Sequence, residues 1–236
     1  MTERLLTNVT CNYNEIEEKI TKAAELSGRK RSDITFLAAT KTVSAPVINH
    51  AISLGLKYIG ENRVQELLQK YDDYSLDKAS LQFIGHLQTN KVKQIIDKVD
   101  LIQSVDSIKL AREISKQAKA VNKVQDILVE VNIGGEESKS GVAPEMLEEL
   151  LFQMSKIDNI SVKGLMTIPR ICENEQKIRE IFLNMHNIFI DISAKKIDNI
   201  SMEVLSMGMS SDYYEAILEG ATMVRIGSAL FGERIY

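Results

Sequence analysis

The sequence predicts an α/β protein whose strands close into a (β/α)8 TIM barrel, preceded by one extra helix. Eight apolar, strand-like runs recur along the 236 residues, and each is followed by a helical pattern except where the chain ends. Strict alternation predicts a parallel sheet, and eight units of about thirty residues fit a barrel at the lower end of its usual size. A doubly wound open sheet is the alternative, but no dinucleotide glycine fingerprint follows the first strand. No linker or low-complexity stretch appears, so residues 1–236 are expected to form one domain.

The elements alternate after a first amphipathic helix over residues 13–26, which ends at Gly28. Several strand candidates carry Val, Ile and Leu with little polar alternation, as expected for strands covered on both faces. Pro46 and Pro144 lie near the starts of two crossover helices, and Asp212 resembles the first residue of a capping box. The predicted strands are residues 34–41, 57–61, 81–86, 101–105, 126–133, 161–168, 202–207 and 222–229.

Composition and charge argue against several classes of protein. A formal net charge of −4, a pI near 5.6 and the lack of a long basic block disfavour a nucleic-acid binder. Residues 1–13 have no apolar signal-peptide core, and no later run approaches a membrane span, so a cytoplasmic protein is expected. Cys11 and Cys172 match no redox spacing, and the three histidines are scattered, so no metal site is expected.

Lys41 is the most informative residue, because it ends the apolar run over residues 34–40. A barrel keeps its active site at the carboxyl ends of its strands, which is where this lysine is expected. Partial burial there would disfavour the ammonium form and lower the pKa of the amine. A neutral amine can attack an aldehyde and form a Schiff base. Viewed alone, such a lysine more often reaches for solvent.

The ends of the last two strands have the character of a phosphate site. Ser206, Gly208 and Ser210 follow the seventh strand, and Gly227 with Ser228 lies at the end of the eighth. Small residues let backbone N–H groups approach phosphate oxygens, and loops after these two strands commonly bind phosphate in barrels. Ordinary capping is the alternative for each turn. Two such turns on adjacent strands, opposite an inward lysine, are more specific than either alone.

Arg225 lies within an apolar strand and must find partners if it is buried, because arginine stays charged. It could pair with a carboxylate such as Glu61 or Asp106. It could equally donate to a ring nitrogen or phosphate of a ligand. The residues alone favour neither the pairing with a carboxylate nor the contact with a ligand.

Three further residues lie at strand ends. His86 is either a satisfied core histidine or part of a pocket wall. Asn62 either caps the helix that begins nearby or contacts a ligand, and Met166 closes the sixth strand. For His86 and Asn62 the purely structural interpretation leads slightly.

Nine segments of the chain carry a resemblance to a known family: residues 36–42, 59–66, 83–91, 131–133, 138–141, 164–166, 205–210, 224–228 and 231–232. Together they resemble the YggS/PROSC family, the pyridoxal phosphate homeostasis proteins. The agreement runs in order through nearly the whole chain, and several segments are long. Two departures from the family pattern are Arg63, where a tyrosine is frequent, and the loop over residues 134–136.

The resemblance implies a barrel like that of alanine racemase, with pyridoxal 5′-phosphate (PLP) as its cofactor. It places Lys41 on the Schiff-base lysine and Arg225 at the pyridine nitrogen of PLP. A cationic partner there disfavours protonation of the ring and weakens PLP as an electron sink. The cofactor-binding residues that we predict are Lys41, Asn62, His86, Met166, Ser206, Gly208, Ser210, Arg225, Gly227 and Ser228.

Two functions remain open, with a carrier favoured over an enzyme. Racemisation needs a proton removed on one face of the α-carbon and another delivered on the opposite face. Alanine racemases supply the second group from an additional domain, for which a chain ending at Tyr236 has no room. We therefore expect a monomer that holds PLP and delivers it, possible recipients being apo PLP enzymes. A small amino-acid racemase is the alternative, and a Schiff-base aldolase for sugar phosphates would leave Arg225 unexplained.

Overall fold

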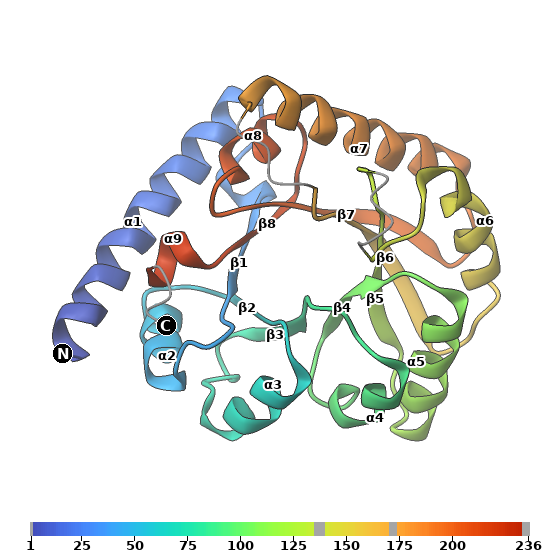
Figure 1. The fold of residues 1–236 in the computed structure, drawn as a ribbon, viewed down its shortest axis with the longest axis horizontal. Coiled ribbons are helices and arrows are strands. Elements are labelled where there is room, and N and C mark those ends of the chain that lie inside the picture. Colours follow the sequence, from blue (N-terminus) through green and yellow to red (C-terminus); the bar gives the residue numbers. More distant parts are fainter. Residues whose placement is uncertain (1, 135–139, 170–173, 233–236) are drawn as a thin grey trace.

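The computed structural model describes residues 2–134, 140–169 and 174–232, the side chain of Thr2 excepted. Within them, eight parallel strands close into a barrel in chain order, with β8 hydrogen-bonded to β1. Figure 1 shows the strands at the centre and the helices around them. The predicted barrel is therefore confirmed. Cys172 and the family-like residues 138–139 lie outside the described ranges.

The strands are β1 (Thr35–Ala39), β2 (Tyr58–Glu61), β3 (Ser80–Phe83), β4 (Leu101–Val105), β5 (Gln125–Glu130), β6 (Ile160–Met166), β7 (Ile200–Met209) and β8 (Met223–Ile226). The α-helices are α1 (Thr2–Leu26), α2 (Ala45–Ser53), α3 (Val64–Lys70), α4 (Val92–Ile95), α5 (Ile108–Ala120), α6 (Pro144–Met154), α7 (Glu175–Lys195), α8 (Tyr213–Leu218) and α9 (Ser228–Phe231). Short 3-10 helices are η1 (Arg31–Asp33), η2 (Tyr71–Asp73) and η3 (Thr89–Lys91). None of the helices in the described ranges is both long and apolar enough to cross a membrane.

Alternation along the strands divides the buried residues into two layers. In β1, Phe36 and Ala38 belong to the main core between strands and helices, whereas Leu37 belongs to a separate buried cluster. Successive strand side chains point to opposite faces, so the second cluster fills the barrel interior. In β8 the same alternation turns Met223 and Arg225 inward. The barrel interior is therefore a packed core with a polar layer.

Helix α1 is longer than the predicted 13–26, because tertiary contacts extend it toward the N-terminus. It packs against α2, α8 and α9 (Figure 1). Val9 is fully buried, and the Asn12 amide donates to the Leu230 carbonyl oxygen at 2.9 Å. Gly28, with φ +73°, ends the helix in the left-handed conformation that favours glycine.

Several predicted boundaries were wrong by a few residues. The first strand ends at Ala39 rather than at 41, because Lys41 has φ +45° and leaves the extended conformation. The last strand ends at Ile226, because Gly227 is the N-cap residue of α9. The capping box at Asp212 is not formed; the carboxylate accepts the N–H of Met209 at 2.6 Å instead.

Candidate cofactor site

The predicted site residues come to one pole of the barrel because parallel strands present their carboxyl ends on the same side. Six of the eight strands, all but β4 and β5, carry or precede a predicted site residue. The residues there are Lys41 after β1, Asn62 after β2, His86 after β3, Met166 at the end of β6, Ser206, Gly208 and Ser210 along and after β7, Arg225 in β8, and Gly227 and Ser228 at the start of α9.

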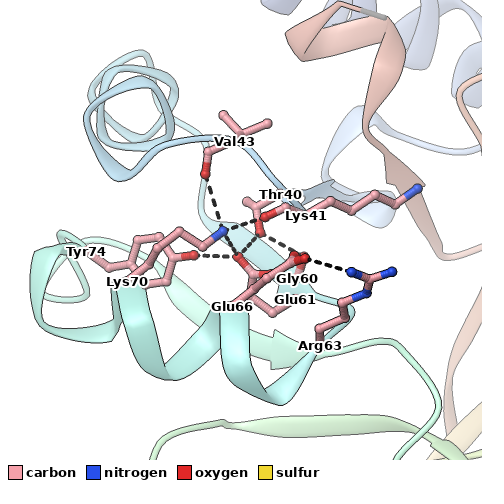
Figure 2. Close-up of polar contacts among 9 residues, drawn as sticks. All are labelled: Thr40, Lys41, Val43, Gly60, Glu61, Arg63, Glu66, Lys70 and Tyr74. Atoms are coloured by element: carbon pink, nitrogen blue, oxygen red, sulfur yellow. Dashed lines mark hydrogen bonds and ion pairs between the residues drawn. The ribbon is translucent and has the colours of Figure 1, made fainter. Parts of the chain in front are cut away.

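Lys41 occupies a tight turn between β1 and α2. The Val43 N–H donates to the Thr40 carbonyl oxygen at 2.9 Å, and the Thr40 N–H donates to the carbonyl oxygen of Gly60 in β2 at 3.0 Å. Lys41 itself is half-buried and has φ +45°, a conformation that costs a non-glycine residue free energy. Its side chain leaves the turn away from the neighbouring Glu61 (Figure 2). Backbone strain of this kind concentrates at functional positions.

The start of α9 meets the end of β7 in a corner of backbone N–H groups. The Ser210 hydroxyl oxygen accepts the N–H of Gly227 at 3.0 Å and that of Ala229 at 3.2 Å. Gly208 has φ +90°, and a Cβ there would lie 2.5 Å from the methyl carbon of Ala216. A Cβ on Gly227 would lie 3.0 Å from the Ala39 carbonyl oxygen. The corner therefore depends on small residues. Backbone N–H groups are the donors that a phosphate requires, and a phosphate accepting from Gly227 or Ala229 would replace the Ser210 hydroxyl as their acceptor.

Arg225 is a buried cation inside the barrel, with 3% of its surface exposed. It donates to the Ser206 hydroxyl oxygen at 2.6 Å and to the Thr167 carbonyl oxygen at 2.8 Å. Burial lowers the pKa of its guanidinium to about 10, against the opposite effect of Glu130 and Asp212, so it is charged at neutral pH. Among the described residues no carboxylate lies within ion-pair distance of it. Its remaining N–H donors suit a ligand acceptor.

Ser206 is fully buried and belongs with Arg225 rather than with the corner at α9. Its hydroxyl donates to the side-chain oxygen of Gln103 at 2.7 Å. The Gln103 amide in turn donates to Gln82 at 2.6 Å. This chain of hydrogen bonds, from Gln82 through Gln103 and Ser206, orients the guanidinium of Arg225. Gln82 and Gln103 were not predicted from the sequence, although a glutamine inside each of two apolar strands was a visible signal.

The three remaining predicted residues lie in different surroundings. Asn62 is half-buried, and its side-chain oxygen is buried without a hydrogen-bond partner in the described part of the chain. It does not cap α3, whose N-cap residue is Arg63. An unpaired buried acceptor suits a ligand donor. Met166 is fully buried in the interior cluster, whereas His86 is exposed, with Nδ1 3.2 Å from the Ser140 hydroxyl oxygen.

Glu130 is a buried carboxyl group at the carboxyl end of β5, with 7% of its surface exposed. Burial, reinforced by the charge of Asp106 and opposed by Arg225, raises its pKa to about 7. Its ordinary value is 4.5. Glu130 was not predicted from the sequence, because a glutamate at a strand end carries no distinguishing local signal.

We predict that Glu130→Gln flattens the pH dependence of stability. Between about pH 4.5 and 7 the folded chain keeps the Glu130 proton that the unfolded chain has released. The wild-type free energy of unfolding therefore falls as the pH rises through that window. Glutamine keeps the neutral shape, so at pH 8 the variant should be more stable by roughly 1–3 kcal/mol.

Urea unfolding of the unloaded protein at pH 5 and pH 8 measures this difference. The exposed Glu18→Gln is the control, and it should leave the wild-type pH dependence in place. A Glu130→Gln variant that keeps the wild-type pH slope would contradict the assignment.

Among the described residues, no three His, Cys, Asp or Glu side chains are grouped so that they could hold a metal ion. The donors gathered at the pole are instead a lysine, an arginine, hydroxyls and backbone N–H groups. Such donors suit an aldehyde, a ring acceptor and a phosphate rather than a metal.

Comparison with known proteins agrees with this geometry. Residues 12–235 match the family model of the alanine racemase N-terminal domain. The fold and the site thus define a barrel protein of the alanine racemase type. A pyridoxal phosphate homeostasis protein of Aquifex aeolicus (strain VF5) is 47% identical over 97% of this chain and 100% of its own length. The chain therefore belongs to the family of pyridoxal phosphate homeostasis proteins, as the resemblance in the sequence predicted.

Two solved structures are similar over almost the whole chain. A protein from Bifidobacterium adolescentis, described as unknown, has a TM-score of 0.93 at 34% identity, covering 98% of this chain and 97% of that one. PipY of Synechococcus elongatus PCC7942, solved with PLP bound, has a TM-score of 0.80 at 29% identity, covering 90% of this chain and 100% of that one.

Proposed function

We propose that this protein binds PLP, holds it on Lys41 as a Schiff base and serves intracellular PLP homeostasis by delivering the cofactor. The observation that carries the proposal is Arg225, a buried cation with spare donors in the barrel interior. A lysine and a phosphate site would also suit a sugar-phosphate aldolase. A buried arginine suits a ligand that carries a ring nitrogen as well. PipY, at 29% identity, was solved with PLP.

Each predicted residue then has a chemical role. Lys41 engages the aldehyde, and the backbone around Gly208, Ser210, Gly227 and Ser228 receives the phosphate. Arg225 faces the ring nitrogen, and Ser206 orients Arg225 rather than touching the cofactor. Asn62, His86 and Met166 supply the remaining contacts with the cofactor in this proposal. Residues 1–236 act in this proposal as one domain and as a monomer.

The charge of Arg225 bears on the chemistry of bound PLP. Bound PLP supplies a reactive aldehyde and an electron-withdrawing ring. A cation beside the ring nitrogen disfavours its protonation, so the ring withdraws electrons less strongly. A weaker electron sink stabilises a carbanion less, which fits a protein that holds the cofactor without efficient turnover. The curated relative from Aquifex aeolicus is likewise named for homeostasis and not for a reaction.

The test is transfer of PLP to an apo PLP enzyme. We expect the loaded protein to activate the apoenzyme even when a carbonyl-reactive reagent in solution traps free PLP. Equal amounts of free PLP under the same conditions should activate it far less.

Racemisation of alanine by the loaded protein is assayed in parallel, because an amino-acid racemase is the second candidate. We expect no sustained turnover. Conversion of L- to D-alanine at ordinary enzyme rates, about 1 per second or more, would overturn the carrier proposal.

A further inference from the structure

Four side chains lie against the backbone of the Lys41 turn and form what we call the Glu61 cluster: Thr40, Glu61, Lys70 and Tyr74 (Figure 2). Lys70 is partly buried and the other three are buried. Glu61, at the end of β2, is fully buried. One of its carboxylate oxygens accepts from the Thr40 hydroxyl at 2.6 Å, the Tyr74 hydroxyl at 2.5 Å and Lys70 Nζ at 2.5 Å. Burial and the Glu61 charge raise the pKa of Tyr74, so its hydroxyl stays a donor. These contacts hold the Lys70 ammonium in one place.

Lys70 uses its other donors on the backbone of the Lys41 turn. Its Nζ lies 2.6 Å from the carbonyl oxygen of Lys41 and 3.3 Å from that of Val43. An ammonium has three N–H donors, and the two carbonyls and Glu61 match that number. The side chain of Lys41 extends away from the cluster (Figure 2). Lys70 therefore contacts the backbone of the lysine that we assign to PLP, without approaching its amine.

The turn needs stabilising contacts because Lys41 has φ +45°, which is unfavourable for a residue with a side chain. Released from its partners, the backbone would relax toward an ordinary conformation. The direction of the Cα–Cβ bond would change with it and carry the amine away from its position. Strained conformations persist only where surrounding contacts over-determine them. Lys70 and Glu61 provide those contacts from α3 and β2.

We propose that Lys70, held by Glu61, is a positioning residue that sets the direction of Lys41 for Schiff-base formation. This inference rests on the proposed PLP function, since it assigns a role around the same lysine. The competing interpretation is a buried ion pair that affects stability alone. The two differ in what happens when both charges are removed together.

The test compares Lys70→Met with the double variant Glu61→Gln/Lys70→Met. Removing Lys70 alone leaves a buried carboxylate uncompensated, so that variant should lose stability. The double variant removes both charges and should recover much of the lost stability. Neither variant retains the contacts to the carbonyls of Lys41 and Val43. If Lys70→Met fails to fold, the double variant alone decides the question.

Lys123→Met is the matched control. Lys123 is also half-buried, and its Nζ donates to two backbone carbonyls, at 3.1 Å to Ile96 and 2.5 Å to Val99. Its loop precedes β5 and therefore lies at the opposite pole of the barrel. The control removes the same kind of contact away from the site.

Three measurements are made on each full-length variant: thermal unfolding without PLP, the dissociation constant for PLP, and the fraction of Lys41 that borohydride labels in the presence of PLP. We expect both Lys70 variants to bind PLP about tenfold more weakly and to label Lys41 less, as a misplaced reacting group would. Lys123→Met should change stability alone.

Wild-type affinity and labelling in either folded Lys70 variant would overturn the positioning role, and so would an affinity that recovers with stability in the double variant. Failure of the wild-type protein to label Lys41 is a separate result. It would refute the proposed function, and the positioning role with it, before any variant is compared.

Discussion

Lys41→Ala is expected to abolish covalent capture of PLP. The loaded wild-type protein should be yellow, and borohydride should fix the cofactor to the peptide that contains Lys41. The variant should lose the visible absorbance of the imine, because the nearby amine of Lys70 is engaged with Glu61 and with the carbonyl oxygens of residues 41 and 43. It should bind PLP at least about a hundredfold more weakly, or roughly 2.7 kcal/mol, through the remaining contacts alone. Absorbance titration and peptide mass spectrometry measure both effects.

The control for this experiment is Lys57→Ala. Lys57 is exposed and immediately precedes β2, so it lies at the opposite pole of the barrel. Its replacement should change neither absorbance nor affinity. Borohydride label recovered on a lysine other than Lys41 would contradict the assignment of Lys41 as the Schiff-base lysine.

Arg225→Met is expected to weaken PLP binding by about ten- to a hundredfold, the usual effect of losing a hydrogen bond that involves a charged group. The absorbance spectrum should shift as well, because the cation proposed to face the ring nitrogen is gone. Without PLP, the variant should be at least as stable as the wild type. A methionine of similar length removes a buried charge that has no ion-pair partner among the described residues. Affinity and stability should therefore change in opposite directions.

Arg29→Met provides the matched control for Arg225. Arg29 is also an arginine that donates to backbone carbonyls, at 2.8 Å to Ala221 and at a second contact to Ile217. It follows α1 and precedes β1, away from the carboxyl pole. Its loss should lower the unfolding temperature and leave affinity for PLP unchanged. Unchanged affinity and spectrum in Arg225→Met would rule out the contact with the ring.

The fold was predictable because its signals are local. Apolar runs with little alternation marked the eight strands, and spacing of three and four residues marked the helices between them. Boundaries were less accurate where backbone geometry decided them. The sequence pattern predicts Lys41 as the last residue of a strand, whereas its positive φ places it in the turn after the strand. The N-terminal half of α1 also depends on contacts, such as that of Asn12 with Leu230, that no local pattern reveals.

The candidate site was also predictable only in part. Lys41, Arg225 and the small residues around Gly208 and Gly227 were visible as unusual residue types at strand ends. The residues that hold them in place by hydrogen bonds were not visible in the sequence. Ser206 was assigned to the phosphate in the sequence analysis, whereas its hydroxyl lies between Arg225 and Gln103. These partners are 19 and 103 residues away along the chain.

By itself, the sequence determined the order of strands and helices, the family, and the two charged residues that a PLP site would use. Only the tertiary structure decided which groups hold those residues in place, such as Lys70 behind Lys41. The physical reason is that periodicity and turn chemistry act between neighbours in the chain. Hydrogen bonds inside a closed barrel depend instead on strand register and on the direction in which each side chain leaves its backbone.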